Sequence, residues 1–238
     1  MKNKIHYQDL IVFENDNYLV INKPAFVSTL EDRNDDFNIL SIFRAHYETI
    51  FVCHRLDKET TGALLLAKSE DAFRHAAMQF ESREVDKVYH ALVYGHFEED
   101  TLEVDVPLKV GGSGTVRIDK RKGKEATTIF RLGKTISNYS LVEAKPISGR
   151  RHQIRVHLAY LNFPICGDTQ YGGKPIFLSD FKKKYRPSKE KEERPLFNRV
   201  ALHARSLKFL DLDRKVVEIT CDYPKDIQMI MNKLEKFG

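Results

Sequence analysis

Residues 53–67 consist of a polar segment with one aspartate, followed by an apolar run that is typical of a fully buried strand. Such a strand would hold the polar segment on a rigid support. If the segment is extended, Arg55 and Asp57 share one face while His54 and Leu56 share the other. A carboxylate and a guanidinium would then face the same cleft, where the carboxylate could act as a base or a nucleophile. The simpler alternative is a surface turn with an incidental Arg–Asp pair.

A second group of cationic side chains lies in residues 149–158. If this stretch opens a helix, His152 and Arg155 are three positions apart on one face. The buried stripe of that helix would consist of Ile154, Leu158 and Leu161. The pattern predicts a helix with cationic groups on one side and core contacts on the other.

Three histidines, His54, His152 and His157, invite comparison with a zinc site, because imidazole is a common zinc ligand. The sequence has no HExxH motif and offers these histidines no clear carboxylate or cysteine partner. We therefore expect no metal site.

Local patterns indicate the elements that must position these groups. Two short strands at 11–13 and 18–21 flank a tight turn at 14–17. A short amphipathic helix begins near Asn38, with its apolar positions at Ile39, Ile42, Phe43 and Tyr47. Ser69 is a suitable N-cap for a second helix ending near Arg83, whose apolar face would consist of Phe73, Ala76, Ala77 and Phe80.

The rest of the chain is rich in strands. Residues 87–95 are apolar on both faces, and residues 101–145 read as short strands with turns at 111–114 and 122–124. A helix from Lys225 ends the chain. We predict an α+β fold with a mixed, mainly antiparallel central sheet and flanking helices.

Composition limits the class of protein. The chain of 238 residues is 42% apolar, which indicates a globular protein, and we expect a single catalytic domain over residues 1–238. It has no apolar run of membrane-spanning length and no apolar core of a signal peptide. Its three scattered cysteines suggest no disulfide framework. We expect a cytoplasmic protein that does not enter a membrane.

The net charge of +5 is concentrated in two places. Residues 182–194 and residues 117–124 each carry a net charge of +4, so the remainder of the chain is mildly acidic. Basic loops on such a body suit a polyanion such as nucleic acid. Solvated loops without a partner are the alternative, and the composition of 182–194 indicates a flexible loop.

The polar segment resembles the HRLD-x-x-[TS]-[TS]-G signature of the RluA-type pseudouridine synthases. Further segments resemble that family in the same order: 22–25, 87–95, 123–128, 149–158, 165–172, 202–207 and 222–224. Two positions depart from the family pattern. Phe26 stands where glycine is usual, and Arg151 replaces a threonine.

The resemblance implies an RNA uridine isomerase that needs no cofactor. Asp57 matches the catalytic aspartate, Arg155 the arginine that ion-pairs with it, and Tyr89 the tyrosine that lies against the target base. Residues expected to contact RNA or the flipped base are Arg55, His54, Leu202, Lys124, Arg150 and His152. The carboxylate would attack the anomeric carbon or take the proton from the 2′ carbon, and the sequence does not choose between these routes.

The expected partner is structured RNA, either ribosomal or transfer RNA, and the protein is expected to act as a monomer. Because the family's NKP element begins here at residue 22, we expect no S4-like RNA-binding domain before it. Two other functions are weighed against this one. The first is an RNA-binding or RNA-chaperone protein without catalysis. The second is a metal-dependent phosphodiesterase that uses Asp57, His54 and His157.

Overall fold

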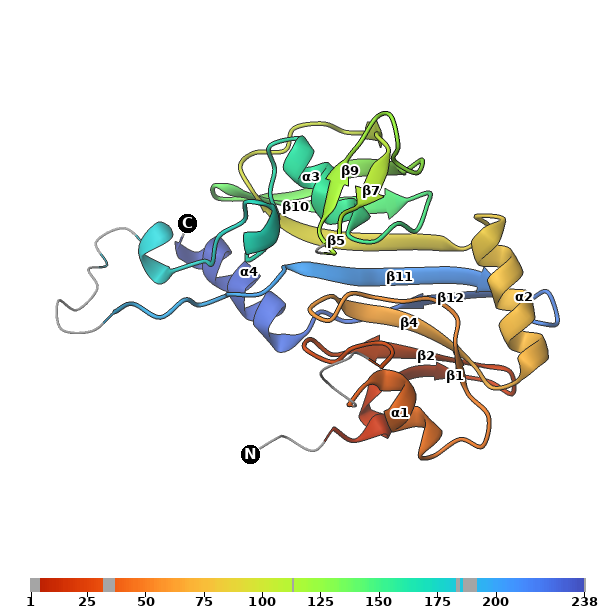
Figure 1. Ribbon diagram of the computed structural model, residues 1–238. Helices are drawn as coiled ribbons and strands as arrows, with labels where there is room; N and C mark the ends of the chain where they lie inside the picture. The colour runs from red at the N-terminus through yellow and green to blue at the C-terminus, as the bar shows by residue number, and fades with distance from the viewer. Residues whose placement is uncertain (1–4, 32–36, 113, 183–184, 186–191, 238) are drawn as a thin grey trace. The chain divides into compact units, whose positions relative to one another are not determined.

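The computed structural model describes residues 5–31, 37–112, 114–182, 185 and 192–237 (Figure 1). Most of the basic segment predicted at 182–194 lies outside these residues. The chain divides into two compact units. The first unit consists of Met1–Val88 and His203–Asp222, and the second of Tyr89–Leu202 and Tyr223–Gly238. The single domain expected over residues 1–238 stays a prediction.

The first unit is built around strand β4. Its elements are η1 (Tyr7–Leu10), β1 (Ile11–Glu14), β2 (Tyr18–Lys23), α1 (Ile39–Arg44), β3 (Phe51–Val52), β4 (Thr61–Ala67), α2 (Glu70–Glu81), the start of β5 (Asp86–Tyr94), most of β11 (Leu202–Leu210) and β12 (Val216–Thr220). The strands are ordered β1-β2-β4-β11, with β3 also on β4 and β12 on β11. Every pair is antiparallel except β4 and β11, which run parallel.

Strand β4 is buried along its whole length, which confirms the strand predicted from the apolar run. Its second residue, Gly62, has a φ of 108°. A Cβ at this position would lie 2.2 Å from the carbonyl oxygen of Ala204 on β11. Glycine is therefore required here, because no side chain fits so close to a neighbouring backbone.

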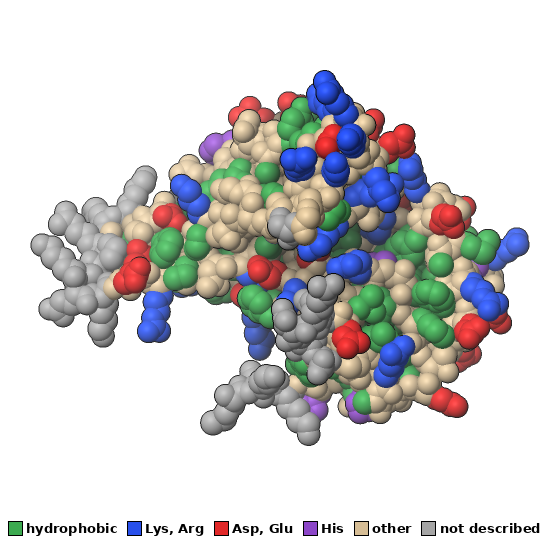
Figure 2. Space-filling view, viewed as in Figure 1, with side chains coloured by type: hydrophobic (Ala, Val, Ile, Leu, Met, Phe, Trp, Pro, Cys, Tyr) green, Lys and Arg blue, Asp and Glu red, His purple; other side chains and the backbone are tan. Residues whose placement is uncertain are grey.

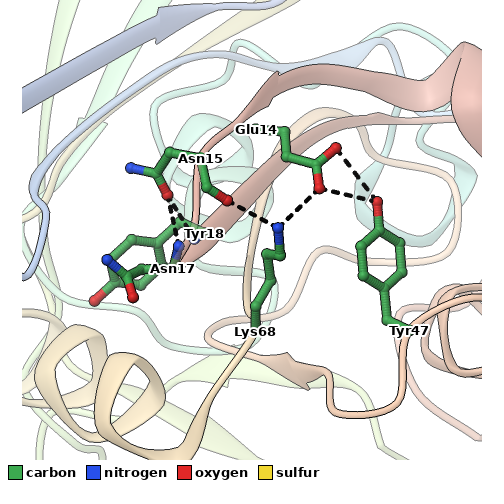
Figure 3. A network of polar contacts seen from close by, with 6 residues as sticks. All are labelled: Glu14, Asn15, Asn17, Tyr18, Tyr47 and Lys68. Atoms are coloured by element: carbon green, nitrogen blue, oxygen red, sulfur yellow. Dashed lines mark hydrogen bonds and ion pairs between the residues drawn. The ribbon is translucent and has the colours of Figure 1, made fainter.

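The predicted turn between β1 and β2 is confirmed, and polar contacts fix it (Figure 3). The Asn15 side chain accepts hydrogen bonds from the amides of Asn17 and Tyr18 at 3.0 and 2.7 Å. Lys68, just after β4, donates to the Asn15 carbonyl and to the Glu14 carboxylate, both at 2.9 Å. The turn is thus tied to the end of the central strand.

Both predicted helices of the first unit are present, with differences in detail. Helix α1 begins at the Asn38 cap but ends at Arg44, so Tyr47 lies beyond it. Ser69 caps α2 as predicted, accepting from the Ala72 amide.

The buried side chains of α2 differ from the predicted stripe: they are Ala72, Ala76 and Gln79. Gln79 is buried because its amide group donates to the Leu210 carbonyl at 2.9 Å and accepts from the Leu210 amide at 2.8 Å. A glutamine satisfied in this way can replace an apolar residue in the core.

Among its described residues, the second unit combines an antiparallel sheet with two α-helices. Its remaining elements are β6 (Leu102–Asp105), β7 (Leu108–Val110), β8 (Val116–Ile118), β9 (Thr127–Ile136), β10 (Tyr139–Pro146), α3 (Gln153–Tyr160), η2 (Thr169–Tyr171), η3 (Leu178–Asp180) and α4 (Lys225–Phe237). Strands are ordered β5-β10-β9-β6, and β7 and β8 form a separate hairpin. The strand-rich region and the terminal helix are confirmed.

Helix α3 packs on two parts of the second unit. Ile154 and Leu158 belong to the main core, together with the buried face of α4, whereas Val156 packs against the β7–β8 hairpin. Leu161, predicted on the buried stripe, is the half-buried C-cap.

The two units together confirm the predicted α+β class, with a mixed and mainly antiparallel sheet. Within the described residues, no helix combines the length and apolar character needed to cross a bilayer.

Candidate active site

Asp57 lies in an irregular segment between β3 and β4 in the first unit. Arg55 is exposed and Asp57 half-buried, whereas Leu56 between them is buried, which agrees with the predicted alternation of side chains. The Leu56 backbone is anchored by Thr29, whose hydroxyl donates to the Leu56 carbonyl at 2.8 Å and accepts from its amide at 3.1 Å. The residue before Asp57 is therefore fixed in place.

The residue after Asp57 is fixed as well. The Lys58 carbonyl accepts from the Phe26 amide at 2.8 Å and from the Lys23 ammonium at 3.2 Å. Lys23 is fully buried, and its ammonium also donates to the carbonyls of Pro24 and Val27 at 3.0 and 2.8 Å. A buried ammonium needs such partners, so the NKP element is a structural support for the Asp57 segment.

His54 points toward β4. Its Nε2 accepts a hydrogen bond from the Leu65 amide at 3.1 Å, and its ring lies 4.9 Å from the ring of Phe80. Burial, with a smaller contribution from Lys87, lowers the pKa of His54 to about 3. His54 is therefore neutral at pH 7 and holds the segment to the sheet, and its contact with RNA stays a prediction.

Arg155 lies on α3 in the second unit and is 7% exposed. Its guanidinium forms a two-pronged pair with Asp168, with Nε–Oδ2 at 2.7 Å and Nη2–Oδ1 at 2.8 Å. Nη2 also donates to Gln170 at 3.1 Å, and the guanidinium carbon lies 4.9 Å from the centre of the Tyr171 ring. Its predicted pairing with Asp57, a residue of the other unit, stays a prediction.

Tyr171 links Arg155 to the β7–β8 hairpin. Its hydroxyl accepts from the Val116 amide on β8 at 3.0 Å and lies 2.8 Å from Nδ1 of His152. His152 does not share a helix face with Arg155 as predicted, because it caps α3 with a left-handed φ of 54° and the helix begins at the next residue. His152 and Arg155 are instead connected through Tyr171.

Cationic side chains gather over the part of the second unit that contains β7 and β9 (Figure 2). Lys124 exchanges two backbone hydrogen bonds with Leu108 at the base of the hairpin. The exposed Arg150 donates to the Glu125 carbonyl at 3.0 Å. Asp119, just after β8, stays ionised, because hydrogen bonds lower the pKa of its carboxyl group. The hydrogen bond from the Lys122 amide makes the largest contribution. The cationic side chains around the hairpin form a surface suited to phosphate groups.

Tyr89 and Leu202 also belong to the second unit. Leu202 is buried in its main core, and the half-buried Tyr89, opposite Ala144 on β10, packs against that core. The predicted site residues therefore divide between the units. Asp57, Arg55 and His54 lie in the first, and Arg155, Tyr89, Leu202, Lys124, Arg150 and His152 lie in the second.

Comparison with known proteins gives the family. Residues 17–160 match the family described as RNA pseudouridylate synthase. The chain belongs to this family. The match includes Asp57, Tyr89 and Arg155, so each residue assigned to the chemistry lies inside the synthase region.

Curated relatives of this chain include several ribosomal large subunit pseudouridine synthases C. The protein from Buchnera aphidicola is 33% identical over 89% of this chain and 65% of its own length. The protein from Vibrio cholerae is 37% identical over 69% and 53%. The chain thus spans about half to two thirds of the length of these relatives.

Two solved human synthase domains resemble the fold. RNA Pseudouridylate Synthase Domain Containing 1 is 28% identical with a TM-score of 0.68, covering 90% of this chain and 83% of that one. RNA Pseudouridylate Synthase Domain Containing 4 has a TM-score of 0.72 at 24% identity, covering 96% and 95%, and shows the fold alone.

Sequence reasoning missed several residues that hold the candidate site residues in place. Asp168, Tyr171 and Lys23 all stand in segments that resemble the family, but nothing in the sequence shows which atoms they contact. For Lys23 the sequence did offer a signal, because a lysine that directly ends an apolar strand is buried only when it has dedicated hydrogen-bond partners.

Proposed function

We propose that this protein converts uridine to pseudouridine in RNA, with the Asp57 carboxylate acting at the sugar. The reaction breaks the bond from N1 of uracil to C1′ of ribose and makes a bond from C5 to C1′. The hydrogen on C5 leaves and a hydrogen joins N1, so no oxidant, reductant or transferred group is needed. Asp57 either attacks C1′ or takes a proton from C2′.

The observation that carries this proposal is the support around Asp57. Its two neighbours have their backbones bonded to Thr29, Phe26 and Lys23, while Asp57 itself remains half-buried. A catalytic carboxylate held by its neighbours needs little reorganisation when the substrate arrives.

Arg155 pairs with Asp57 in this proposal and orients its carboxylate. Asp168 and Gln170 bond Nε and Nη2 and so fix the orientation of the guanidinium. Because Asp168 offsets part of the guanidinium charge, the main contribution of Arg155 is orientation.

The target base leaves its stack before reaction, at a cost of a few kcal/mol. Tyr89 stacks on the flipped uracil, Leu202 lines its pocket, and Arg55 stacks against bases beside the vacancy. Lys124, Arg150 and His152 contact the RNA backbone or the base from the second unit.

Ribosomal RNA is the first candidate substrate, because the names of the curated relatives specify it. Transfer RNA is the second candidate. We place the protein in the cytoplasm as a monomer, where its three unpaired thiols suit a reducing compartment. Mapping pseudouridines in total RNA with and without the gene identifies the modified position.

The activity is tested with RNA carrying tritium at C5 of uridine, because forming the new bond releases that hydrogen. Wild-type protein should release tritium. Asp57→Asn should release none while binding RNA about as tightly as wild type, since affinity comes from cationic and stacking contacts. Release by the variant would overturn the role of Asp57. Binding without release by wild type would favour an RNA-binding protein that does not catalyse.

A further inference from the structure

Phe26 combines an unfavourable backbone with an exposed ring. Its φ is 64°, in the left-handed region, and the residue is 58% exposed. Bulky side chains rarely adopt this conformation, because the Cβ approaches the following carbonyl oxygen. Such an outlier persists only when its surroundings fix it, and outliers of this kind cluster at functional sites.

Hydrogen bonds fix the backbone of Phe26 against the Asp57 segment. The Phe26 amide donates to the Lys58 carbonyl, and three residues later Thr29 bonds both backbone groups of Leu56. From the other side, the Ile39 amide donates to the Ser28 carbonyl at 2.9 Å. The segment from Phe26 to Thr29 is therefore held between the start of α1 and the Asp57 segment.

Packing of the ring does not account for the strained backbone. Most of the side chain faces solvent, and among the described residues its ring makes no ring–ring or cation–π contact. Exposing a phenylalanine ring also forgoes the free energy of burial. The position thus carries two unfavourable features, and among the described residues no ring–ring or cation–π contact offsets them.

The surroundings of Phe26 suit a nucleic acid strand. Its backbone lies within about 10 Å of that of Asp57, since it bonds the next residue along the chain. Stacked bases follow one another at about 3.4 Å, so this distance spans the one to three nucleotides beside the target. Lys58, on the same segment, is an exposed cation suited to the phosphates of that strand, and the exposed Arg55 stacks beside the vacancy.

We propose that Phe26 is a stacking platform for an unpaired base next to the target uridine. The inference rests on the proposed function, because Asp57 marks where the target sugar lies. Every base has a flat face that can stack on an aromatic ring, so the platform would bind the strand without sequence preference. It would hold the flanking strand while the target base is turned.

Binding of a short single-stranded oligouridylate tests the platform without requiring catalysis. Phe26→Gly removes the ring, so it should weaken the affinity for oligouridylate about 5- to 150-fold. Because glycine suits this backbone conformation, the Tm should fall by no more than about 2 °C. Phe26→Tyr keeps the ring and should bind like wild type. An oligomer of the same length with abasic sugars removes the base, so wild type and Phe26→Gly should bind it equally.

Two controls separate stacking from other effects of substitution. Ser137→Gly relieves a similar φ of 53° in the second unit, and Met78→Ala removes another exposed apolar side chain, 66% exposed on α2. Neither variant should change affinity for oligouridylate.

Three results would overturn the proposal. The first is equal affinity of wild type and Phe26→Gly for oligouridylate, and the second is a large fall in Tm for the variant. The third is self-association of wild type that Phe26→Gly abolishes, since Phe26 and the exposed Leu30 would then form an interface between copies. Tritium release is measured separately, so the two failures are distinguishable. Failure of the platform shows in the affinity for oligouridylate and leaves the role of Asp57 standing, whereas failure of the role of Asp57 shows in tritium release.

Discussion

Arg155→Lys keeps the positive charge, but it is expected to lower both the free energy of unfolding and the rate of reaction. The guanidinium makes two parallel bonds to Asp168, which is 1% exposed, and a third to Gln170. An ammonium cannot reproduce this planar fork. Hydrogen bonds to charged groups contribute about 1.5–3 kcal/mol each, and a buried carboxylate that loses one keeps an unsatisfied oxygen.

The loss of at least one such bond should lower the free energy of unfolding by about 2–4 kcal/mol. For a chain of this size each kcal/mol shifts the Tm by about 2–4 °C, so a fall of roughly 5–15 °C is expected. The single-turnover rate of tritium release at saturating RNA should fall at least tenfold, because the guanidinium would no longer be aligned.

Arg74→Lys is the matched control. Arg74 on α2 pairs with Glu70 at 3.1 Å, but both side chains are 70% exposed. That substitution should change the free energy of unfolding by no more than about 0.5 kcal/mol. If Arg155→Lys behaves like Arg74→Lys in both stability and rate, the planar fork of Arg155 is not what holds Asp168 or aligns the site.

Three further predictions concern the ring of Tyr89, the neutral His54 and the basic segment. Tyr89→Ala should weaken binding of the flipped base while Tyr89→Phe keeps it, as measured by substrate affinity; equal loss in both would point to the hydroxyl instead. Because the pKa of His54 is about 3 in the folded protein against 6.5 unfolded, the unfolded state binds the proton more readily between those values. Stability should therefore fall as pH drops from 6.5 toward 3, by at most about 1.4 kcal/mol per pH unit, and Tm measurements should show a shallower fall for His54→Gln. Replacing the Lys and Arg residues of segment 182–186 with serine should reduce the dependence of log affinity on log salt by about 0.7 per lost phosphate contact to single-stranded RNA; an unchanged slope would exclude contact.

Local signals were enough to predict much of the fold. The turn before Tyr18, the strand β4 and the Ser69 cap depend on residues within a few positions of one another. Side-chain chemistry at such short range is visible in the sequence, because the partner is always nearby.

Features that depend on distant partners could not be predicted. Gln79 interrupts an otherwise apolar helix face because its amide group bonds the backbone of Leu210. That partner lies 131 positions away in the sequence. Asp168, which pairs with Arg155, is 13 positions away, in a turn whose path the sequence does not reveal. The buried ammonium of Lys23 likewise needs the Lys58 carbonyl, 35 positions on. Such pairs become visible only after the chain has folded.

Phe26 shows a different limit. The sequence comparison marked it as a departure from a usual glycine, and the positive φ gives the physical reason that glycine is usual there. No pattern of neighbouring residues could show that the ring would be exposed.

The parallel pairing of β4 with β11 has a consequence for how the chain folds during synthesis. Thr61 and His203, which face each other across this pair, are 142 residues apart. At about 5–20 residues per second, the ribosome needs roughly 7–28 s to make the intervening chain. Throughout that time β4, whose residues are all buried in the finished protein, lacks its partner on one edge. An unpaired apolar edge invites pairing with other chains, so aggregation in the nascent state, and protection by chaperones, should depend on how quickly β11 emerges.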